Sequence, residues 1–312
     1  MKEIGGYFGL ELDRGMEFHK NAMPLNTGRN ALEYILRANN YDKIYLPFFI
    51  CEVVLEPIRK HQLEIEFYSI NEQLEPIFDF NVIEDKSAFL YVNYFGLKNL
   101  FVQTLCKKCK NLIIDNSQSF FSKPEYKTDT FYSPRKFFGV PDGAYLYCNK
   151  KLNITLKIDQ SWDRSSHLLK RLDINAEFGF DNFKNNELEL VNLDIKQMSN
   201  LSKAILSSIN YKKAIQRRTE NYNFLDAALA KFNNLRLSND DGIPMVYPFW
   251  TNDPNIKEKL RKRQIYTATY WENVKRWCTN ESLEYQLTNE VVYLPIDQRY
   301  GKTEMENILK YI

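Results

Sequence analysis

The sequence reads NLIIDNSQ at residues 111–118 and FYSPRKFFG at residues 131–139, and these two stretches decide the expected fold. The first begins as a near-continuous apolar run, which is typical of a strand buried on both faces of a parallel sheet. This run ends in Asp115, and ligands of open α/β sheets bind at the carboxyl ends of the strands. The second stretch places Lys136 in an aromatic, glycine-flanked turn between strands. We therefore expect an α/β protein with its site at one edge of a sheet.

Segments around these two stretches alternate between helix-like and strand-like patterns. Alternation of this kind predicts a mainly parallel sheet covered by helices. The strands expected before residue 151 lie at 43–47, 64–70, 88–96, 111–118 and 143–150, with helices from Thr27 to about residue 38 and over 51–61. Long helical patterns fill residues 160–230, and strands are expected at 244–250, 265–271 and 291–296, with helices at about 254–264 and 302–311.

The turn signal Asn-Asp-Asp-Gly at residues 239–242 suggests a boundary between a large and a small domain. We expect an N-terminal segment (1–24), a large domain that includes interdomain helices (25–235) and a small C-terminal α+β domain (236–312).

Bulk composition excludes several classes of function. The 312 residues are 44% hydrophobic and 26% charged, which is ordinary for a soluble globular protein, and the net charge of +2 gives no reason to expect a nucleic-acid or anionic-membrane partner. The basic clusters at 217–218 and 259–263 are interpreted as solvated helix faces. No apolar run approaches the roughly 18–20 residues that a membrane span needs, and the N-terminus does not resemble a signal peptide.

Cysteine usage favours a reduced, cytoplasmic protein. The five cysteines are an odd number at irregular spacing, which does not suggest a disulfide framework. Cys106 and Cys109 form a lone CxxC, but no second ligand pair lies at a spacing that a zinc site requires. We interpret both as helix residues before a buried strand and expect no metal.

Three short motifs carry the expected chemistry. Thr27-Gly28 opens a helix, where free backbone N–H groups and the helix dipole favour a phosphate, and Arg29 could add a charged contact. Asp115 at a strand end could keep a pyridinium nitrogen protonated. Lys136 could act as an amine nucleophile if burial strips water from it. Each motif alone has a plain alternative: an ordinary helix cap, a turn aspartate and a surface lysine.

Taken in order, these motifs resemble the DegT/StrS family of sugar aminotransferases, which use pyridoxal phosphate (PLP) and have the fold-type I, aspartate-aminotransferase-like fold. The resemblance implies that Thr27-Gly28 binds the cofactor phosphate, that Asp115 pairs with the pyridine nitrogen and that Gln118 neighbours the ring. Lys136 would hold the cofactor as an internal aldimine. Pro47, the VNYFG stretch at residues 92–96 and the pair Tyr270-Trp271 are looser matches. The likeness covers most of residues 25–150.

The sequence departs from the family pattern at several positions. Phe131 stands where the family usually has a serine that helps to hold the phosphate, and Ser133 could substitute for it. Either Phe49 or Cys51 would occupy the neighbourhood of the aromatic residue that stacks on the ring. The Asn-x-Arg segment that reaches across the dimer in relatives has no clear counterpart, the nearest stretch being IKQMSNLS at residues 195–202. Family members also tend to be longer.

The resemblance implies a homodimeric aminotransferase that moves an amino group from an amino acid, usually glutamate, to a keto-sugar attached to a nucleotide. Surface-glycan or antibiotic-sugar synthesis is the family expectation. One alternative keeps PLP but acts on a different ketone or dehydrates a sugar, although dehydrating relatives replace the lysine with histidine. A second alternative is a PLP-fold dimer without catalysis that has a binding or regulatory role. A Rossmann-like binding protein is disfavoured because no Gly-x-Gly-x-x-Gly turn follows the first strand.

Overall fold

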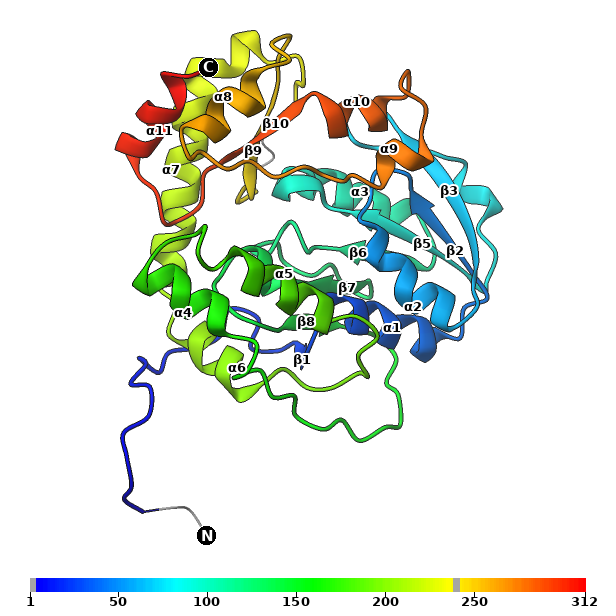
Figure 1. The fold of residues 1–312 in the computed structure, drawn as a ribbon. Helices are drawn as coiled ribbons and strands as arrows, with labels where there is room; N and C mark the ends of the chain where they lie inside the picture. Colours follow the sequence, from blue (N-terminus) through cyan, green and yellow to red (C-terminus); the bar gives the residue numbers. More distant parts are fainter. Residues whose placement is uncertain (1–3, 238–241) are drawn as a thin grey trace.

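A computed structural model describes residues 4–237 and 242–312. Its largest element is an eight-stranded sheet with the order β1-β8-β7-β6-β5-β2-β3-β4 (Figure 1). Adjacent pairs from β3 through β2, β5 and β6 to β7 are parallel, whereas β1, β8 and β4 pair antiparallel with their neighbours. The strands are β1 (Met23–Leu25), β2 (Lys43–Pro47), β3 (Glu64–Ile70), β4 (Pro76–Ile77), β5 (Ser87–Val92), β6 (Leu112–Asp115), β7 (Asp129–Tyr132) and β8 (Ala144–Tyr147).

The expected mainly parallel sheet is therefore confirmed, and each of the five strands expected before residue 151 is present. Strand β5 is buried along its whole length and β6 likewise, as their continuous apolar sequences predict. Sequence patterns missed β1, β4 and β7. The first two are only three and two residues long, and β7 carries the polar residues Asp129 and Thr130 inside the fold.

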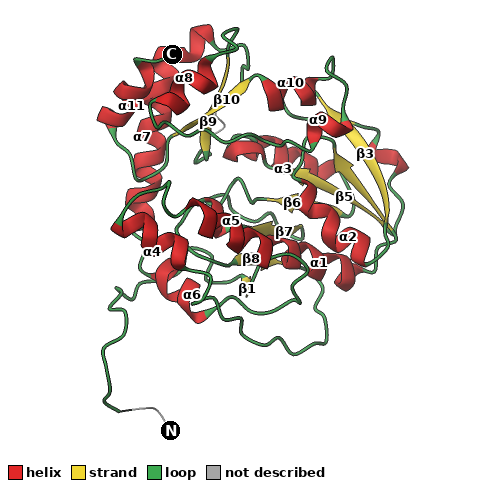
Figure 2. Ribbon diagram, in the orientation of Figure 1, coloured by secondary structure: helices red, strands yellow, loops and turns green. Residues whose placement is uncertain are grey.

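Helices pack around the sheet (Figure 2). Those before residue 230 are α1 (Gly28–Asn39), α2 (Leu55–Lys60), α3 (Asn99–Lys108), α4 (Ser166–Asp173), α5 (Phe180–Glu189), α6 (Asn200–Ser207) and α7 (Tyr211–Leu229). Helix α1 packs against β7 and β8 through an apolar face that includes Ala31, Leu32 and Ile35. Cys106 lies in α3 and Cys109 caps its end, as expected for helix residues before a buried strand.

The C-terminal part contains a separate two-stranded antiparallel sheet of β9 (Val246–Trp250) and β10 (Val291–Pro295). It lies with α7, α8 (Ile256–Lys262) and α11 (Lys302–Leu309), while α9 (Val274–Trp277) and α10 (Leu283–Asn289) lead back toward β3 (Figure 1). The predicted boundary turn at residues 239–242 lies, except for Gly242, outside the described residues, so the domain limits stay a prediction.

The prediction of a strand at residues 265–271 was wrong. Its aromatic and β-branched residues fit a strand, but only Ala268 forms a bridge, to Tyr293 of β10. The carbonyl of Tyr270 instead accepts a hydrogen bond of 3.0 Å from the Thr288 hydroxyl, and the Tyr270 ring packs on Phe95 and Tyr293. Side-chain packing and a side-chain hydrogen bond replace the ladder that a strand needs.

Candidate active site

The candidate site forms because several strands end at the same edge of the sheet. Strands β2, β6 and β7 run in one direction, and β1 shares it because both β1 and β7 are antiparallel to β8. Their carboxyl ends lead to Thr27 after β1, Cys51 after β2, Asp115 at the end of β6 and Lys136 after β7. Residues far apart in the sequence thus meet where open α/β sheets bind their ligands.

Helix α1 begins at this edge with a side-chain cap. The Thr27 hydroxyl oxygen accepts a hydrogen bond of 3.0 Å from the Asn30 N–H, and its own proton goes to the Asn30 side-chain oxygen at 2.6 Å. The N–H groups of Gly28 and Arg29 precede the first hydrogen bonds within the helix. A Cβ atom at Gly28 would lie 3.9 Å from the Phe131 ring, so this ring borders the helix N-terminus.

Lys136, Ser117 and Asp115 form a connected group. The Lys136 ammonium donates a hydrogen bond of 2.9 Å to the Ser117 hydroxyl, and the Ser117 N–H donates one of 2.7 Å to the Asp115 carboxylate. Asp115 is buried, and burial raises its pKa, while the charge of Lys136 and the bonds from Ser117 oppose that rise. Sequence reasoning missed Ser117, although it lies between two residues that were predicted.

Lys136 itself is exposed, which contradicts the expectation that burial strips water from its amine. The turn Pro134–Lys136 is a single 3-10 turn that starts after Ser133, and it leaves Lys136 exposed although Pro134 and Phe137 are buried. The Lys136 Nζ atom nevertheless contacts the buried Ser117 hydroxyl, so the exposure of the residue comes with one polar contact to the protein.

Gln118 and Ser133 also lie at this edge. The Gln118 side-chain oxygen accepts a hydrogen bond of 3.2 Å from the Phe95 N–H, but its buried Nε2 has no hydrogen-bond partner among the described residues. Ser133 is 9% exposed and its carbonyl accepts from the Lys136 N–H at 3.4 Å. An orphaned buried donor costs free energy in a cofactor-free protein, so it points to a missing acceptor.

Phe49 and Cys51 have different surroundings. Phe49 is fully buried against Trp271 and Tyr94, with ring centroids 5.0 and 5.6 Å away. Burial raises the pKa of the Cys51 thiol, and the charges of Lys136, Arg29 and Asp115 also act on it. Phe49 therefore belongs to the core, and which of the two residues would neighbour a bound ring stays a prediction.

No protein-family model matches the chain, and no curated protein matches it by sequence. Solved structures do match. The chain superposes with a TM-score of 0.65 on DesV of S. venezuelae in complex with a ketimine intermediate, at 14% identity over 93% of this chain and 83% of that one. For a DegT DnrJ EryC1 StrS aminotransferase from Brucella abortus the TM-score is 0.61, at 14% identity over 93% of this chain and 84% of that one. For the sugar aminotransferase CalS13 from Micromonospora echinospora the TM-score is 0.63, at 16% identity over 94% of this chain and 86% of that one.

The chain has the fold of these aminotransferases. It is the α/β, fold-type I architecture that the sequence motifs indicate, and the likeness extends over more than nine-tenths of the chain. At these identities the comparison establishes the fold, whereas the chemistry depends on the residues at the carboxyl edge of the sheet.

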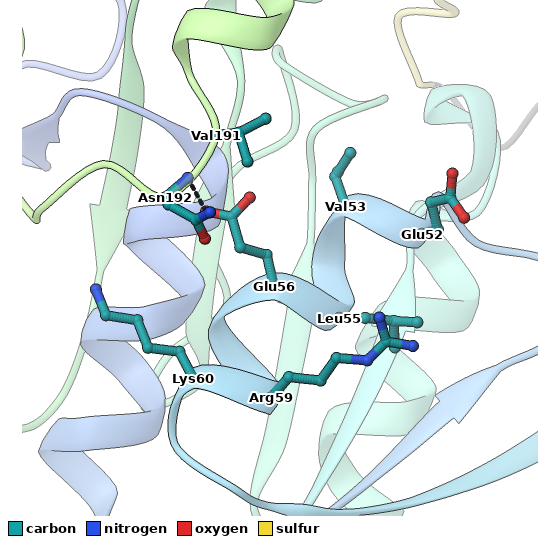
Figure 3. A pocket seen from close by; sticks show the side chains of 8 residues that line it. All are labelled: Glu52, Val53, Leu55, Glu56, Arg59, Lys60, Val191 and Asn192. Carbon is teal, nitrogen blue, oxygen red and sulfur yellow. Dashed lines mark hydrogen bonds between the residues drawn. The ribbon is translucent and has the colours of Figure 1, made fainter.

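In this aminotransferase fold, Arg29 is directed away from the α1 N-terminus. Its guanidinium donates a hydrogen bond of 2.6 Å to the Leu190 carbonyl and lies 3.7 Å from Glu56. Glu56 also accepts from the Asn192 N–H at 2.8 Å, as Figure 3 shows. These contacts border an open hollow of about 580 Å³ between α2 and the chain at Val191–Asn192, which lies beside the candidate site and not at Lys136.

The turn after Lys136 is fixed by a buried carboxylate. Asp142 is fully buried and accepts hydrogen bonds from the N–H and hydroxyl of Ser199, at 2.8 and 2.6 Å, and from the Ser202 hydroxyl. The next residue, Gly143, has φ +130°, and its N–H donates to the Asn26 carbonyl at 2.6 Å. The turn is thereby held against the segment that precedes α1.

The loop that carries Lys136 is also held in place by residues of α7 and of the C-terminal part. The Arg218 guanidinium lies 4.6 Å from the centre of the Phe137 ring and donates to the Gln298 side chain at 2.9 Å, and Gln298 donates to the Phe137 carbonyl at 2.7 Å. Arg218 is 1% exposed, and burial lowers its pKa to about 10. The prediction of a solvated face at residues 217–218 was therefore wrong for Arg218, because the C-terminal part covers that side of α7.

Among residues 4–237 and 242–312, no group of three or more His, Cys, Asp or Glu side chains is arranged to hold a metal ion. No helix in the same part of the chain is both long and apolar enough to cross a membrane.

Proposed function

We propose that the chain is a PLP-dependent aminotransferase that moves an amino group from an amino acid, glutamate by family resemblance, to a nucleotide-linked keto-sugar. The observation that carries the proposal is the connected group of Lys136, Ser117 and buried Asp115 at the carboxyl edge of an aminotransferase fold. The ketimine complex of DesV and the sugar-aminotransferase name of CalS13 support the choice of chemistry and substrate class. A cytoplasmic homodimer stays part of the proposal.

The residues present fit the cofactor. Gly28 leaves the start of α1 open to an anion, and the unpartnered Nε2 of Gln118 offers a donor to a ring substituent. Asp115 provides a buried carboxylate, which is the partner that a pyridinium nitrogen requires. When bound, PLP supplies an aldehyde that condenses with amines and a ring that withdraws electrons.

The roles of the side chains follow from their positions. The N–H groups of Gly28 and Arg29 would hold the phosphate, and the Asp115 carboxylate would retain a proton on the ring nitrogen. The Lys136 amine would carry the cofactor, and once released it would take a proton from the substrate carbon and return it to the neighbouring position. Ser117 holds the Lys136 Nζ atom, so it orients the amine for both tasks.

A visible spectrum of the protein purified with added PLP tests this proposal. We expect a yellow band that borohydride bleaches, its absence in Lys136→Ala, and its retention in Lys123→Ala, which removes another exposed lysine. Glutamate should convert the band to the pyridoxamine form, and a panel of keto-sugars would then identify the acceptor. A colourless wild-type protein that cannot be reconstituted would overturn the enzyme proposal.

A non-catalytic PLP-fold dimer is the second candidate. The Phe131 ring beside Gly28 favours it, because an apolar ring replaces a hydroxyl donor at the expected phosphate position. Weak binding of PLP without turnover of any amino donor would support this candidate over the enzyme.

A further inference from the structure

The α4–α5 hairpin, residues 166–189, exposes several large apolar side chains, which is unusual for helices on a protein surface. Its six most exposed apolar residues are Leu169, Leu172, Ile174, Phe178, Phe180 and Leu188, with exposed fractions from 51 to 83%. Toward the body, the hairpin instead buries polar residues such as His167 and Asn186. Helices on a protein surface normally face the core with their apolar side. An apolar patch of this kind marks an interaction surface.

A second uncovered apolar surface lies in the N-terminal arm, residues 4–14. This arm has no helix or strand, and it runs away from the body (Figure 1, blue). Ile4, Tyr7, Phe8 and Leu10 are 75 to 99% exposed. The arm is anchored where the Gly15 N–H donates to the Ser207 carbonyl at 3.0 Å, and a Cβ at Gly15 would approach that oxygen to 2.8 Å.

We infer that the arm of one copy of this chain binds the α4–α5 hairpin of a second copy, in a reciprocal two-fold exchange. The arm points away from its own body, so its own chain leaves these apolar side chains uncovered. A two-fold axis lets each copy contribute one arm and one hairpin, and both apolar surfaces are then covered at once. The inference specifies the homodimer that the proposed function includes, and it rests on that function only for the expectation of a dimer.

The available area suits a stable dimer. Tyr7 and Phe8 are almost fully exposed, and aromatic side chains each bury about 150–250 Å². Together with the aliphatic arm residues and the half-exposed hairpin residues, each copy can bury on the order of 800 Å², which is the size of a standard interface. The two surfaces are thus large enough to hold two copies together without further contacts.

Charge argues against an anionic membrane as the occupant of the hairpin. Residues 166–189 carry three Lys or Arg and five Asp or Glu. Helices that bind anionic lipid surfaces are instead rich in Lys and Arg on the polar face. A protein surface that is itself apolar, such as the arm, is the better match.

Docking at the hairpin would also affect the candidate site. The Glu187 carboxylate pairs with Arg135, the neighbour of Lys136, and the Asn186 side chain donates to the Pro141 carbonyl at 3.0 Å. A bound arm would therefore lie on the element that flanks the exposed Lys136 loop. The exchange connects dimer formation to the covering of the site.

The first test is the mass of the full chain in solution by light scattering across a concentration series. Wild-type protein should be a dimer. The arm variant Tyr7→Ser/Phe8→Ser and the hairpin variant Leu172→Ser/Phe180→Ser should each weaken the dimer by about 30-fold or more, the effect of losing interface hot spots. The control Tyr126→Ser/Phe232→Ser removes two rings exposed elsewhere and should stay dimeric. Circular dichroism checks that every variant is folded.

The second test locates the contact. A photo-reactive benzoyl-phenylalanine replaces Phe8, and equal amounts of light and heavy-isotope protein are mixed before irradiation. Cross-links between a light arm and a heavy peptide from 166–189 would support the exchange. A monomeric wild type, cross-links only within one chain, a dimer as tight in both variants as in the wild type, or flotation with anionic vesicles that the hairpin variant loses would each overturn it. None of these readouts depends on PLP, so they fail or succeed separately from the visible spectrum.

Discussion

The Lys136 ammonium and the Ser117 hydroxyl are joined by a hydrogen bond of 2.9 Å, although the two residues come from loops after different strands. Ser117 follows β6 and Lys136 follows β7, and these neighbouring parallel strands end at the same edge. The Ser117 N–H holds Asp115 as well. One short loop therefore positions both the amine and the carboxylate on which the proposed chemistry depends.

Ser117→Ala should slow the proposed half-reaction with glutamate about tenfold, because Lys136 loses the bond that orients it, worth about 1.4 kcal/mol. Stopped-flow absorbance of the cofactor band gives this rate. The control is Ser207→Ala, which removes an exposed hydroxyl that donates to the Ala204 carbonyl in α6, and it should react at the wild-type rate. Equal rates in Ser117→Ala and wild type would show that the hydrogen bond does not orient the amine.

Asp115→Asn should stabilise the cofactor-free protein at neutral pH while it impairs the proposed PLP chemistry. Burial raises the pKa of Asp115 in the folded protein, so the folded state binds more protons than the unfolded state above the ordinary carboxyl range. Stability of the wild type therefore falls as pH rises through that window. The asparagine carries no charge and can still accept from the Ser117 N–H.

Melting temperatures of wild type and Asp115→Asn at pH 4 and pH 8 check this expectation. The advantage of the variant should grow by a few degrees between the two pH values, given about 2–4 °C per kcal/mol for large domains. A difference that is constant with pH would mean that Asp115 has no raised pKa in the folded protein.

Gly143→Ala should destabilise the protein by about 1–3 kcal/mol, because φ +130° is unfavourable for any residue with a side chain. The new Cβ would also approach Met198 and Pro134 to 3.1 Å. Urea unfolding measures the loss. Gly139→Ala, in the same loop and without a positive φ, should cost much less, and equal costs for both variants would argue against backbone strain at Gly143.

Much of the fold could be predicted because its strands are apolar and buried. Strands β5 and β6 have continuous apolar sequences, and β2 and β3 end at the residues that the sequence indicates. Strand β7 could not be recognised, since only four residues form it and two of them are polar. Its partners β6 and β8 stabilise it through backbone hydrogen bonds that no local pattern reveals.

The candidate site was predictable as a set of strand ends but not in its contacts. Asp115 and Lys136 were recognised by residue type and order, whereas Ser117 has no distinguishing sequence signal. The sequence left open whether Lys136 is buried or exposed, and the prediction of a solvated face was wrong for Arg218, because packing between distant segments determines both. The packing of Phe49 on Trp271 likewise depends on distant segments and has no sequence signal.

The link between the C-terminal part and the Lys136 loop gives a further prediction. Gln298→Leu removes the donor to the Phe137 carbonyl and the acceptor for Arg218, and it should cost about 1–3 kcal/mol for each buried group left unpaired. It should also slow attachment of PLP to Lys136, the residue next to Phe137. Gln298→Glu keeps the acceptor for Arg218, so its loss of stability in urea should be smaller. Equal losses of stability in the two variants would show that the contact between Gln298 and Arg218 does not stabilise the protein.

Phe131→Ser tests whether the ring beside Gly28 limits cofactor binding. The ring lies 3.9 Å from the position of a Gly28 Cβ, at the helix end that would hold the phosphate. A serine there would vacate that space and add a hydroxyl donor, so we expect PLP to bind about tenfold more tightly, a gain of about 1.4 kcal/mol from one charge-assisted hydrogen bond. Phe131 is also 3% exposed, so the cofactor-free variant should lose about 3–5 kcal/mol of stability.

Fluorescence titration with PLP and urea unfolding separate these two effects. Phe89→Ser is the matched control, because it removes a fully buried ring from β5, which β6 separates from β7, and should lose stability without any gain in affinity. Tighter binding in Phe131→Ser alone would show that the substitution at position 131 weakens an otherwise intact phosphate site. Unchanged affinity would mean that the phosphate is held elsewhere or not at all, and it would favour the non-catalytic dimer.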